Sequence, residues 1–297
     1  MSSIRGIRRT AKPGYMIRIC ILLLISATFL FPLAVTLTNS FMSEQEIAQN
    51  YTTLRSSFDV LDGIEEKFIS FTLIPEKLTV SQYLAVLIDQ PSFLILMTNS
   101  MKLAIPIVAL NLVISLLTAY GFTIWGWKHK ETVFFIYIVV MLMPLQAVLV
   151  PNYIIAEQFQ ITNSYLAIIL PGIFAPFGTF LLRQSMKSLP LSYIEAARLD
   201  GAGDMYILLH LVVPQQKSGI AALLMLNFVE YWNLVDQSVI FIKDYTREPL
   251  SVFLSRMGDN RIGLIFAASC IYLFVPFLIL LYGQRDLEKG IELSGLK

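Results

Sequence analysis

The sequence is poor in charged residues, and this scarcity limits the kind of protein it can be. Only 14% of its 297 residues are Asp, Glu, Lys or Arg, whereas a soluble domain carries about 25%. Its hydrophobic residues, 56% of the chain, are collected in long blocks and do not follow helical or strand spacing. Such a chain cannot cover its surface with polar groups in water, so its composition indicates a protein of the lipid bilayer.

Side chains that ligate metals or react chemically are also scarce. The two cysteines, Cys20 and Cys270, lie far apart in apolar stretches without metal-ligand spacing, which predicts small apolar residues and not a disulfide. The two histidines, His129 and His210, are too few to ligate a stack of haems, which argues against a respiratory haem subunit. The formal net charge of +1 gives no reason to expect a nucleic-acid partner.

Six apolar stretches are long enough to cross a bilayer as helices. A membrane helix needs about 20 apolar residues to cover about 30 Å of hydrocarbon. The first stretch is longer than the apolar core of a signal peptide and no A-x-A site follows it, so we expect a membrane anchor that is not cleaved. The six candidate spans are 19–37, 93–122, 132–150, 165–182, 219–242 and 262–282.

The distribution of positive charge predicts the orientation of these spans. With the N-terminus in the cytosol, 14 of the 22 lysines and arginines fall on the cytosolic side and 8 on the outer side. We therefore predict an all-α polytopic membrane protein with about six transmembrane helices and with both termini in the cytosol. Its expected parts are a cytosolic tail (1–18), a first membrane helix (19–38), an extracytoplasmic segment (39–92), a core with five spans (93–285) and a cytosolic tail (286–297).

The cytosolic loop 183–218 carries the most informative pattern in the chain. Residues 190–199 begin with a proline and continue with good helix formers, and 205–213 form a second apolar run. Gly201 and Gly203 separate the two runs, and glycine tolerates the positive φ that a sharp bend requires. The sequence predicts two short helices joined by a glycine elbow.

A bent helical pair of this kind is compact and stiff enough to sit in a groove of a soluble partner and to transmit a push to the membrane helices. Ala196 and Ala197 would permit close approach of the backbones, and Glu195 and Asp200 would offer anions to a basic residue of the partner. An alternative is that Ser192 and Glu195 form a capping box at the start of the helix.

The spacing within this loop resembles that of the EAA loop of binding-protein-dependent ABC importer permeases. In that family, E-A-A is followed after three residues by G and after nine more by I-x-L-P. Here Glu195-Ala196-Ala197 is followed at the same spacing by Gly201 and by Leu211-Val212-Val213-Pro214, so the departures are Leu for Ile and Val for Leu.

Weaker marks extend the resemblance over roughly residues 93–290 and favour the carbohydrate group, the subfamily of maltose-permease-like proteins. The first 92 residues carry little of it. The marks are Asn99-Ser100, Ala119-Tyr120-Gly121-Phe122, Pro144-Leu145-Gln146 with Pro151, Asn163-Ser164, Trp232-Asn233 and the tail 290–297.

The resemblance implies a mechanism and a set of partners. Two homologous permeases pair in the bacterial plasma membrane, and each docks its loop into a cytosolic ABC ATPase dimer while an extracytoplasmic solute-binding protein delivers the solute. Because this chain has no G-x-x-x-x-G-K-[ST] pattern, ATP and Mg²⁺ would be bound by the ATPase, and we expect no cofactor, metal or enzymatic activity here. The expected solute is a carbohydrate, and within that class an oligosaccharide.

Polar residues in the fifth predicted span are candidates for the substrate path. A charged side chain at the centre of a bilayer costs roughly 2.5–3.5 kcal/mol, so such residues need a purpose. Glu230, Asn233 and Gln237 are spaced to share one helix face, and sugars bind to planar hydrogen-bonding groups and aromatic faces. Alternatively, these residues hydrogen-bond between helices or across the permease pair. The candidates for the path are Glu230, Asn233, Gln237, Asn227, Tyr231 and Gln146.

Three other functions remain open at this point. The same importer class could carry another solute, such as an amino acid or a phosphonate. A secondary transporter would need internal repeats with discontinuous helices; none is evident, and that function leaves the 183–218 loop unexplained. A membrane assembly or sensor subunit without transport activity is the third alternative.

Overall fold

The computed structural model describes residues 13–51, 72, 74–257 and 262–293, and their regular structure is helical throughout. The chain divides into two compact units, residues 1–89 with 258–270 and residues 90–257 with 271–297. Much of the predicted outer segment, most of the N-terminal tail and the last four residues lie outside the described residues. The all-helical fold class is confirmed for the part of the chain that is described.

The first unit contains the long helix α1 (Pro13–Asn39), whose apolar window is not buried at all by the described residues. A helix that is apolar all round and unburied within its own chain suits a lipid environment. Cys20, which is exposed, and Cys270, which is half-buried, are both free thiols in this structure. The remaining elements of this unit are α2 (Glu44–Tyr51), α4 (Ser81–Leu84), the π-helical turn Ala85–Asp89 and the start of α16 (Ile262–Leu293).

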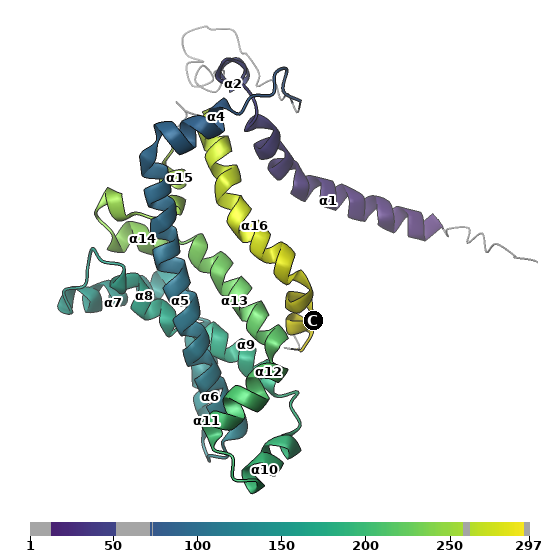
Figure 1. The fold of residues 1–297 in the computed structure, drawn as a ribbon, viewed down its shortest axis with the longest axis vertical. Helices are drawn as coiled ribbons and strands as arrows, with labels where there is room; N and C mark the ends of the chain where they lie inside the picture. Colours follow the sequence, from purple (N-terminus) through teal and green to yellow (C-terminus); the bar gives the residue numbers. More distant parts are fainter. Residues whose placement is uncertain (1–12, 52–71, 73, 258–261, 294–297) are drawn as a thin grey trace, which may run out of the picture. The chain divides into compact units, whose positions relative to one another are not determined.

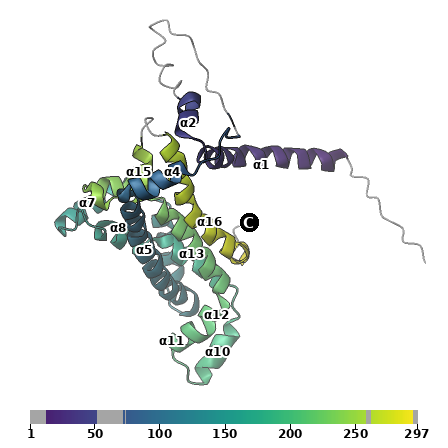
Figure 2. The same cartoon turned by 45° about the horizontal axis from the view of Figure 1, so that its top comes forward.

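The second unit is organised around one long helix, α5 (Pro91–Ile124), which runs through it from end to end (Figures 1 and 2). Helices α9, α13 and α8 make the most extensive contacts with α5. The helices of this unit include α6 (Lys130–Met141), α7 (Leu145–Gln158), α8 (Leu166–Ile173), α9 (Pro176–Met186), α13 (Lys217–Trp232), α14 (Asp236–Phe241), α15 (Leu250–Arg256) and the greater part of α16.

Four of the six predicted spans coincide with helical segments long and apolar enough to cross a membrane. These segments are Met16–Asn39, Ser92–Ile124, Leu166–Met186 and Ile262–Lys289. Two further helix pairs qualify only if each bent pair is counted as one span, so the described residues hold four to six candidate spans.

The predicted span 132–150 is not one continuous helix. Helix α6 ends at Met141 and α7 begins at Leu145, and the two helices meet at 95°. The break falls at Pro144, which has extended backbone angles (φ −64°, ψ 142°). Proline lacks an N–H and disfavours helical geometry at the residue before it, so a helix ends naturally here.

The predicted span 219–242 also has to be corrected. Helix α13 ends at Trp232, because Asn233 Nδ2 donates to the carbonyl of Val229 (2.8 Å) and the Tyr272 hydroxyl donates to the carbonyl of Trp232 (2.7 Å). The Tyr272 hydroxyl thereby satisfies a carbonyl that the helix leaves free at its end, whereas the Val229 carbonyl also accepts the backbone N–H of Asn233 (3.3 Å). Gln237 therefore lies on the separate helix α14 and does not share one helix face with Glu230.

Candidate functional site

The two short helices predicted in the 183–218 loop are present. Helix α10 spans Leu191–Leu199, and the second helical stretch runs from α11 (Asp204–Ile207) through a π-helical turn into α12 (Val213–Gln215), two residues beyond its predicted end. Gly201 between them has a φ of +83°, while Gly203 has ordinary extended angles. Only Gly201 therefore needs the conformational freedom of glycine.

The capping-box alternative for Glu195 is wrong. Helix α10 begins at Leu191 with Pro190 in the N-cap position, so Ser192 already lies inside the first turn. A capping box needs the serine in the N-cap position itself. Glu195 is consequently available for another role.

One face of the elbow is built into the protein core. Ile194 of α10 and Ile207, Leu208 and Val212 of the second stretch are buried. They belong to a cluster formed with side chains of α5, α9 and α13, including Ala119, Leu181, Leu182, Met186 and Leu223. These contacts couple the position of the elbow to that of α5, α9 and α13, because close-packed interiors transmit strain.

The opposite face of the elbow is exposed. Glu195, Ala196, Asp200 and Gly201 are exposed, whereas Ala197 is half-buried and packs against the core cluster. Leu199 is 89% exposed, and Tyr193 and Met205 are exposed as well. Four of the five predicted coupling residues thus lie on the accessible side, next to apolar side chains.

The carboxylate of Asp204, which the sequence did not single out, links the two helices of the elbow to each other and to the end of α5. Asp204 Oδ1 accepts hydrogen bonds from Arg198 (2.9 Å) and from the Tyr120 hydroxyl (2.9 Å), and Oδ2 accepts one from Trp125 Nε1 (3.2 Å). Arg198 lies in the last turn of α10, and the two aromatic residues lie at the end of α5. No local pattern pointed to this contact, since its partners are up to 84 residues away.

Of the six predicted path residues, Asn227 and Tyr231 are buried and bound between helices. Asn227 Nδ2 donates to Asn111 Oδ1 (2.8 Å), and the Tyr231 hydroxyl donates to the carbonyl of Gly172 (3.3 Å). Asn111 itself donates to carbonyls at the break between α8 and α9, those of Gly172, Ile173 and Ala175. For Asn227 and Tyr231, the alternative of interhelical hydrogen bonding describes what the polar atoms do within this chain.

The other four predicted path residues are accessible. Glu230, Asn233 and Gln146 are exposed and Gln237 is half-buried. Asn233 Oδ1 accepts a hydrogen bond from the Tyr272 hydroxyl (2.9 Å). The side chains of Glu230, Gln237 and Gln146 make no hydrogen bond or ion pair with the described residues. The role of all six residues in a substrate path stays a prediction.

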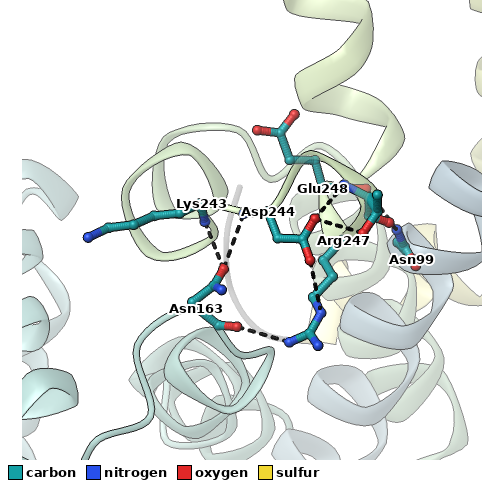
Figure 3. Close-up of polar contacts among 7 residues, drawn as sticks. Asn99, Asn163, Lys243, Asp244, Arg247 and Glu248 are labelled. Carbon is teal, nitrogen blue, oxygen red and sulfur yellow. Dashed lines mark hydrogen bonds and ion pairs between the residues drawn. The ribbon is translucent and has the colours of Figure 1, made fainter.

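At the other end of α5, the segment 243–250 is held by two asparagines (Figure 3). Asn99 Nδ2 of α5 donates to the carbonyls of Thr246 (2.8 Å) and Glu248 (3.1 Å). Asn163, with a φ of +59°, accepts from the backbone N–H groups of Lys243 (2.9 Å) and Asp244 (3.2 Å) through Oδ1. Both asparagines belong to pairs that marked the resemblance, and the structure gives each a structural role.

Charged groups complete the network around residues 243–250. Arg247 donates to the Asn163 carbonyl (3.2 Å) and lies 3.5 Å from Asp244, and Arg256 donates to Glu248 Oε1 (2.6 Å). The hydroxyl and backbone N–H of Thr246, with a smaller effect of Arg247, hold the pKa of the Asp244 carboxyl below its ordinary value. In the described ranges no three His, Cys, Asp or Glu side chains come together as a metal site would require.

A multi-pass helical fold with a partly exposed helical elbow is the architecture of a membrane transport component. The chain belongs to the family of binding-protein-dependent transport system inner membrane components, whose pattern matches residues 92–287. The family resemblance drawn from the E-A-A spacing is thereby confirmed, and the match identifies the chain as a transport permease of the membrane.

Individual relatives cover nearly the whole chain. It is 27% identical over 272 residues to the arabinooligosaccharides transport system permease protein AraQ of Halalkalibacterium halodurans, covering 90% of this chain and 91% of the relative. It is 24% identical over 270 residues to the sn-glycerol-3-phosphate transport system permease protein UgpE of Salmonella typhi, covering 89% and 91%. It is 28% identical over 202 residues to the lactose transport system permease protein LacG of Rhizobium radiobacter, covering 65% and 72%.

A solved structure shares the fold. The chain superimposes with a TM-score of 0.76 on a chain of a bacterial ABC transporter involved in the import of the acidic polysaccharide alginate. The sequences are 18% identical, and the match covers 95% of this chain and 98% of the other.

Proposed function

We propose that this chain is one permease subunit of an ATP-driven carbohydrate importer in a bacterial plasma membrane, with both termini in the cytosol. It would pair with a second, homologous permease, bind a cytosolic ABC ATPase dimer through the elbow, and receive solute from an extracytoplasmic binding protein. The observation that carries the proposal is the elbow itself, which is packed into the helical core on one face and open to a partner on the other.

The proposed coupling follows from this two-sided construction. Glu195 and Asp200 are exposed anions that suit a basic groove, and the neighbouring Leu199 supplies apolar area for docking. When ATP closes the ATPase dimer, α10 moves with the docked subunit. Ile194 and the other buried side chains of the elbow then carry this movement into α5, α9 and α13.

For the solute, the accessible acid Glu230 favours a neutral carbohydrate. Among the described residues no cation pairs with it, and an uncompensated carboxylate would repel a phosphate group in a site of low dielectric. Exposed amides at Asn233 and Gln146 offer the planar hydrogen-bonding groups that hydroxyls require. The glycerol-phosphate relative makes a phosphorylated polyol the second candidate.

Two glycines of the elbow provide a matched test of coupling. A Cβ added at Gly201 or at Gly203 would meet no atom within 4 Å, but only Gly201 has a positive φ. Gly201→Val should therefore strain the elbow by about 1–3 kcal/mol and reduce ATP-dependent uptake into proteoliposomes about tenfold. Gly203→Val should transport like the parent protein.

Co-purification and solute uptake test the remaining parts of the proposal. A tagged chain should bring down an ATPase and a second permease, and failure to do so would contradict the assignment. Uptake of a labelled oligosaccharide should be competed by unlabelled oligosaccharide and not by glycerol 3-phosphate, and the reverse result would favour the second candidate. Glu230→Gln should impair uptake while the exposed Glu157→Gln, on α7, leaves it unchanged.

A further inference from the structure

The junction between the elbow and α5 depends on one carboxylate. Asp204 is the first residue of α11, and it receives hydrogen bonds from three side chains that belong to two other segments. Arg198 reaches it across the glycine joint from α10, and Tyr120 and Trp125 reach it from the end of α5. Asp204 is thus the only described residue whose side chain contacts α10 and α5 together through hydrogen bonds.

The backbone of the joint fixes only part of the angle of the elbow. The N–H groups of Gly201 and Ala202 donate to the carbonyls of Arg198 (3.1 Å) and Ala197 (3.0 Å), which fixes the turn at the end of α10. Gly203, which follows this turn, makes no such bond back to α10 among the described residues, and a Cβ added there would meet no atom within 4 Å. Glycine also has more conformational freedom to lose than any other residue. The angle between α10 and the second helical stretch can therefore change at Gly203, unless a side-chain contact fixes it.

We propose that Asp204 is a positioning residue that fixes the angle of the elbow against α5, so that movement of α10 is passed to α5 and is not absorbed at the glycine joint. The proposal rests on the proposed coupling function. The proposal adds to that function a specific residue outside the E-A-A pattern, Asp204, and names α5 as the helix to which the movement is passed.

The chemistry of the contact suits this role. Hydrogen bonds to an ionised carboxylate are stronger than those between neutral groups, and three of them from rigid or delocalised donors define a direction. The Asp204 side chain is nevertheless 44% exposed, so water and salt weaken the pair with Arg198. The contact can therefore fix the angle of the elbow while α10 moves with the ATPase, without making a large contribution to the stability of the fold.

The cleanest test removes the two α5 donors and leaves Asp204 in place. Tyr120→Phe deletes only the hydroxyl that binds the carboxylate, and Trp125→Phe deletes the indole N–H together with part of a half-exposed ring. In the assembled transporter in proteoliposomes, the ATP hydrolysed per solute imported should rise about threefold to tenfold. The matched control is Tyr153→Phe with Trp127→Phe, since neither of these polar groups has a hydrogen-bond partner among the described residues, and its ratio should not change.

Two variants of Asp204 complete the series. Asp204→Ala should raise the ratio at least as much as the aromatic pair, and Asp204→Glu should restore part of the coupling because the charge is kept. All three variants should still co-purify with the ATPase at the parent level. An unchanged ratio in the Tyr120–Trp125 double variant, in a transporter whose parent form imports solute, would overturn the role of Asp204 and leave the proposed function intact.

A distance measurement tests the angle without any transport assay. Spin labels at Leu117→Cys on the exposed face of α5 and at Ser192→Cys on α10, with the native cysteines replaced by alanine, report the distance between the two helices. Removing the two aromatic donors should broaden the distance distribution, and the control pair should leave it narrow. Equal widths would overturn the proposal even if the chain proved to serve another transport system.

Discussion

Helix α5 is attached to its neighbours in two different ways along its length. At Asn99 and Asn111, buried amides donate to backbone carbonyls of the 246–248 segment and of the α8–α9 break. At Tyr120 and Trp125, neutral donors bind the partly exposed carboxylate of Asp204. The first kind of attachment is shielded from solvent and uncharged, and the second is accessible and charged.

The difference indicates which contacts are permanent and which can be exchanged. A buried amide that loses its carbonyl partner leaves polar groups unsatisfied, which costs about 1–3 kcal/mol for each group. An exposed carboxylate that loses a partner is solvated by water and loses much less. Variants of the amides should therefore damage stability, and variants around Asp204 should damage coupling.

The largest expected effect is on the middle attachment. Asn111→Leu would leave the carbonyls of the α8–α9 break and the amide of Asn227 without their partner. We expect the free energy of unfolding to fall by about 2–4 kcal/mol, measured by loss of helical circular dichroism in a denaturant titration in detergent. Asn227→Leu, which removes a single hydrogen bond, should have a smaller effect. An Asn111→Leu protein that keeps its stability but alters ATP consumption would contradict the assignment of stability to the buried amides and of coupling to Asp204.

Steric crowding at the same attachment gives the second prediction. A Cβ on Gly178 would lie 2.6 Å from Asn111 Oδ1 and closer still to Ser115 Oγ. Gly178→Ala should therefore destabilise the protein by about 1–3 kcal/mol. Gly121→Ala on α5 is the matched control, because its Cβ would meet nothing nearer than 4.0 Å. Equal thermal stability of the two variants would show that Asn111 and Ser115 can move aside without loss of stability.

The segment 243–250 supplies a smaller effect. Asn163→Ala removes the acceptor for two backbone N–H groups and places alanine at positive φ. Trypsin cleavage after Lys243 and Arg247 should accelerate about fivefold to thirtyfold, as expected for a loss of about 1–2 kcal/mol. Asn163→Gly, which relieves only the backbone strain, should be intermediate, and cleavage after Lys128 should not change. Unaltered cleavage after Lys243 would show that the segment is held by other contacts.

The smallest expected effect concerns pH. The folded-state pKa of Asp244 is lowered, mainly by the Thr246 hydroxyl, so its stabilising contribution is present above the ordinary carboxyl pKa of about 3.9 and is lost as the pH falls through the folded-state pKa. Hydrogen exchange at the Thr246 N–H, corrected for its intrinsic rate, should accelerate over this acidic range. Asp244→Asn should abolish the dependence, and a dependence that persists would exclude Asp244 as its origin.

The long helices and the elbow could be predicted because their signals are local. Helices α1, α5 and α16 appear as apolar runs, and the whole elbow pattern lies within 25 residues. Proline was a less reliable guide. Pro144 breaks a predicted span, whereas Pro106 lies within α5 and Pro276 within α16 without ending either helix. In membranes, neighbouring groups can satisfy the backbone that a proline frees, and this depends on tertiary contacts.

The contacts that hold the site could not be predicted, because they join distant residues. Asn99 and Asn163 were visible as marks of the family, but their partners lie 147 and 80 residues further along the chain. The end of α13 at Asn233 depends on Tyr272, 39 residues away. Asp204 had no local pattern at all, since a single aspartate after a glycine elbow is an ordinary way to begin a helix.

The three tryptophans differ in their exposure to solvent, and this difference can be used in a fluorescence experiment. Trp232 is fully buried and stacks on Phe228 and Tyr272, whereas Trp125 and Trp127 are 50% and 39% exposed. Aqueous iodide should therefore quench the emission of the exposed pair and spare the third. Replacing Trp127 with phenylalanine would leave Trp125 as the fluorophore that iodide can quench. Because the indole N–H of Trp125 binds Asp204 of the elbow, the intrinsic fluorescence of the protein would then report changes at the elbow without an attached label.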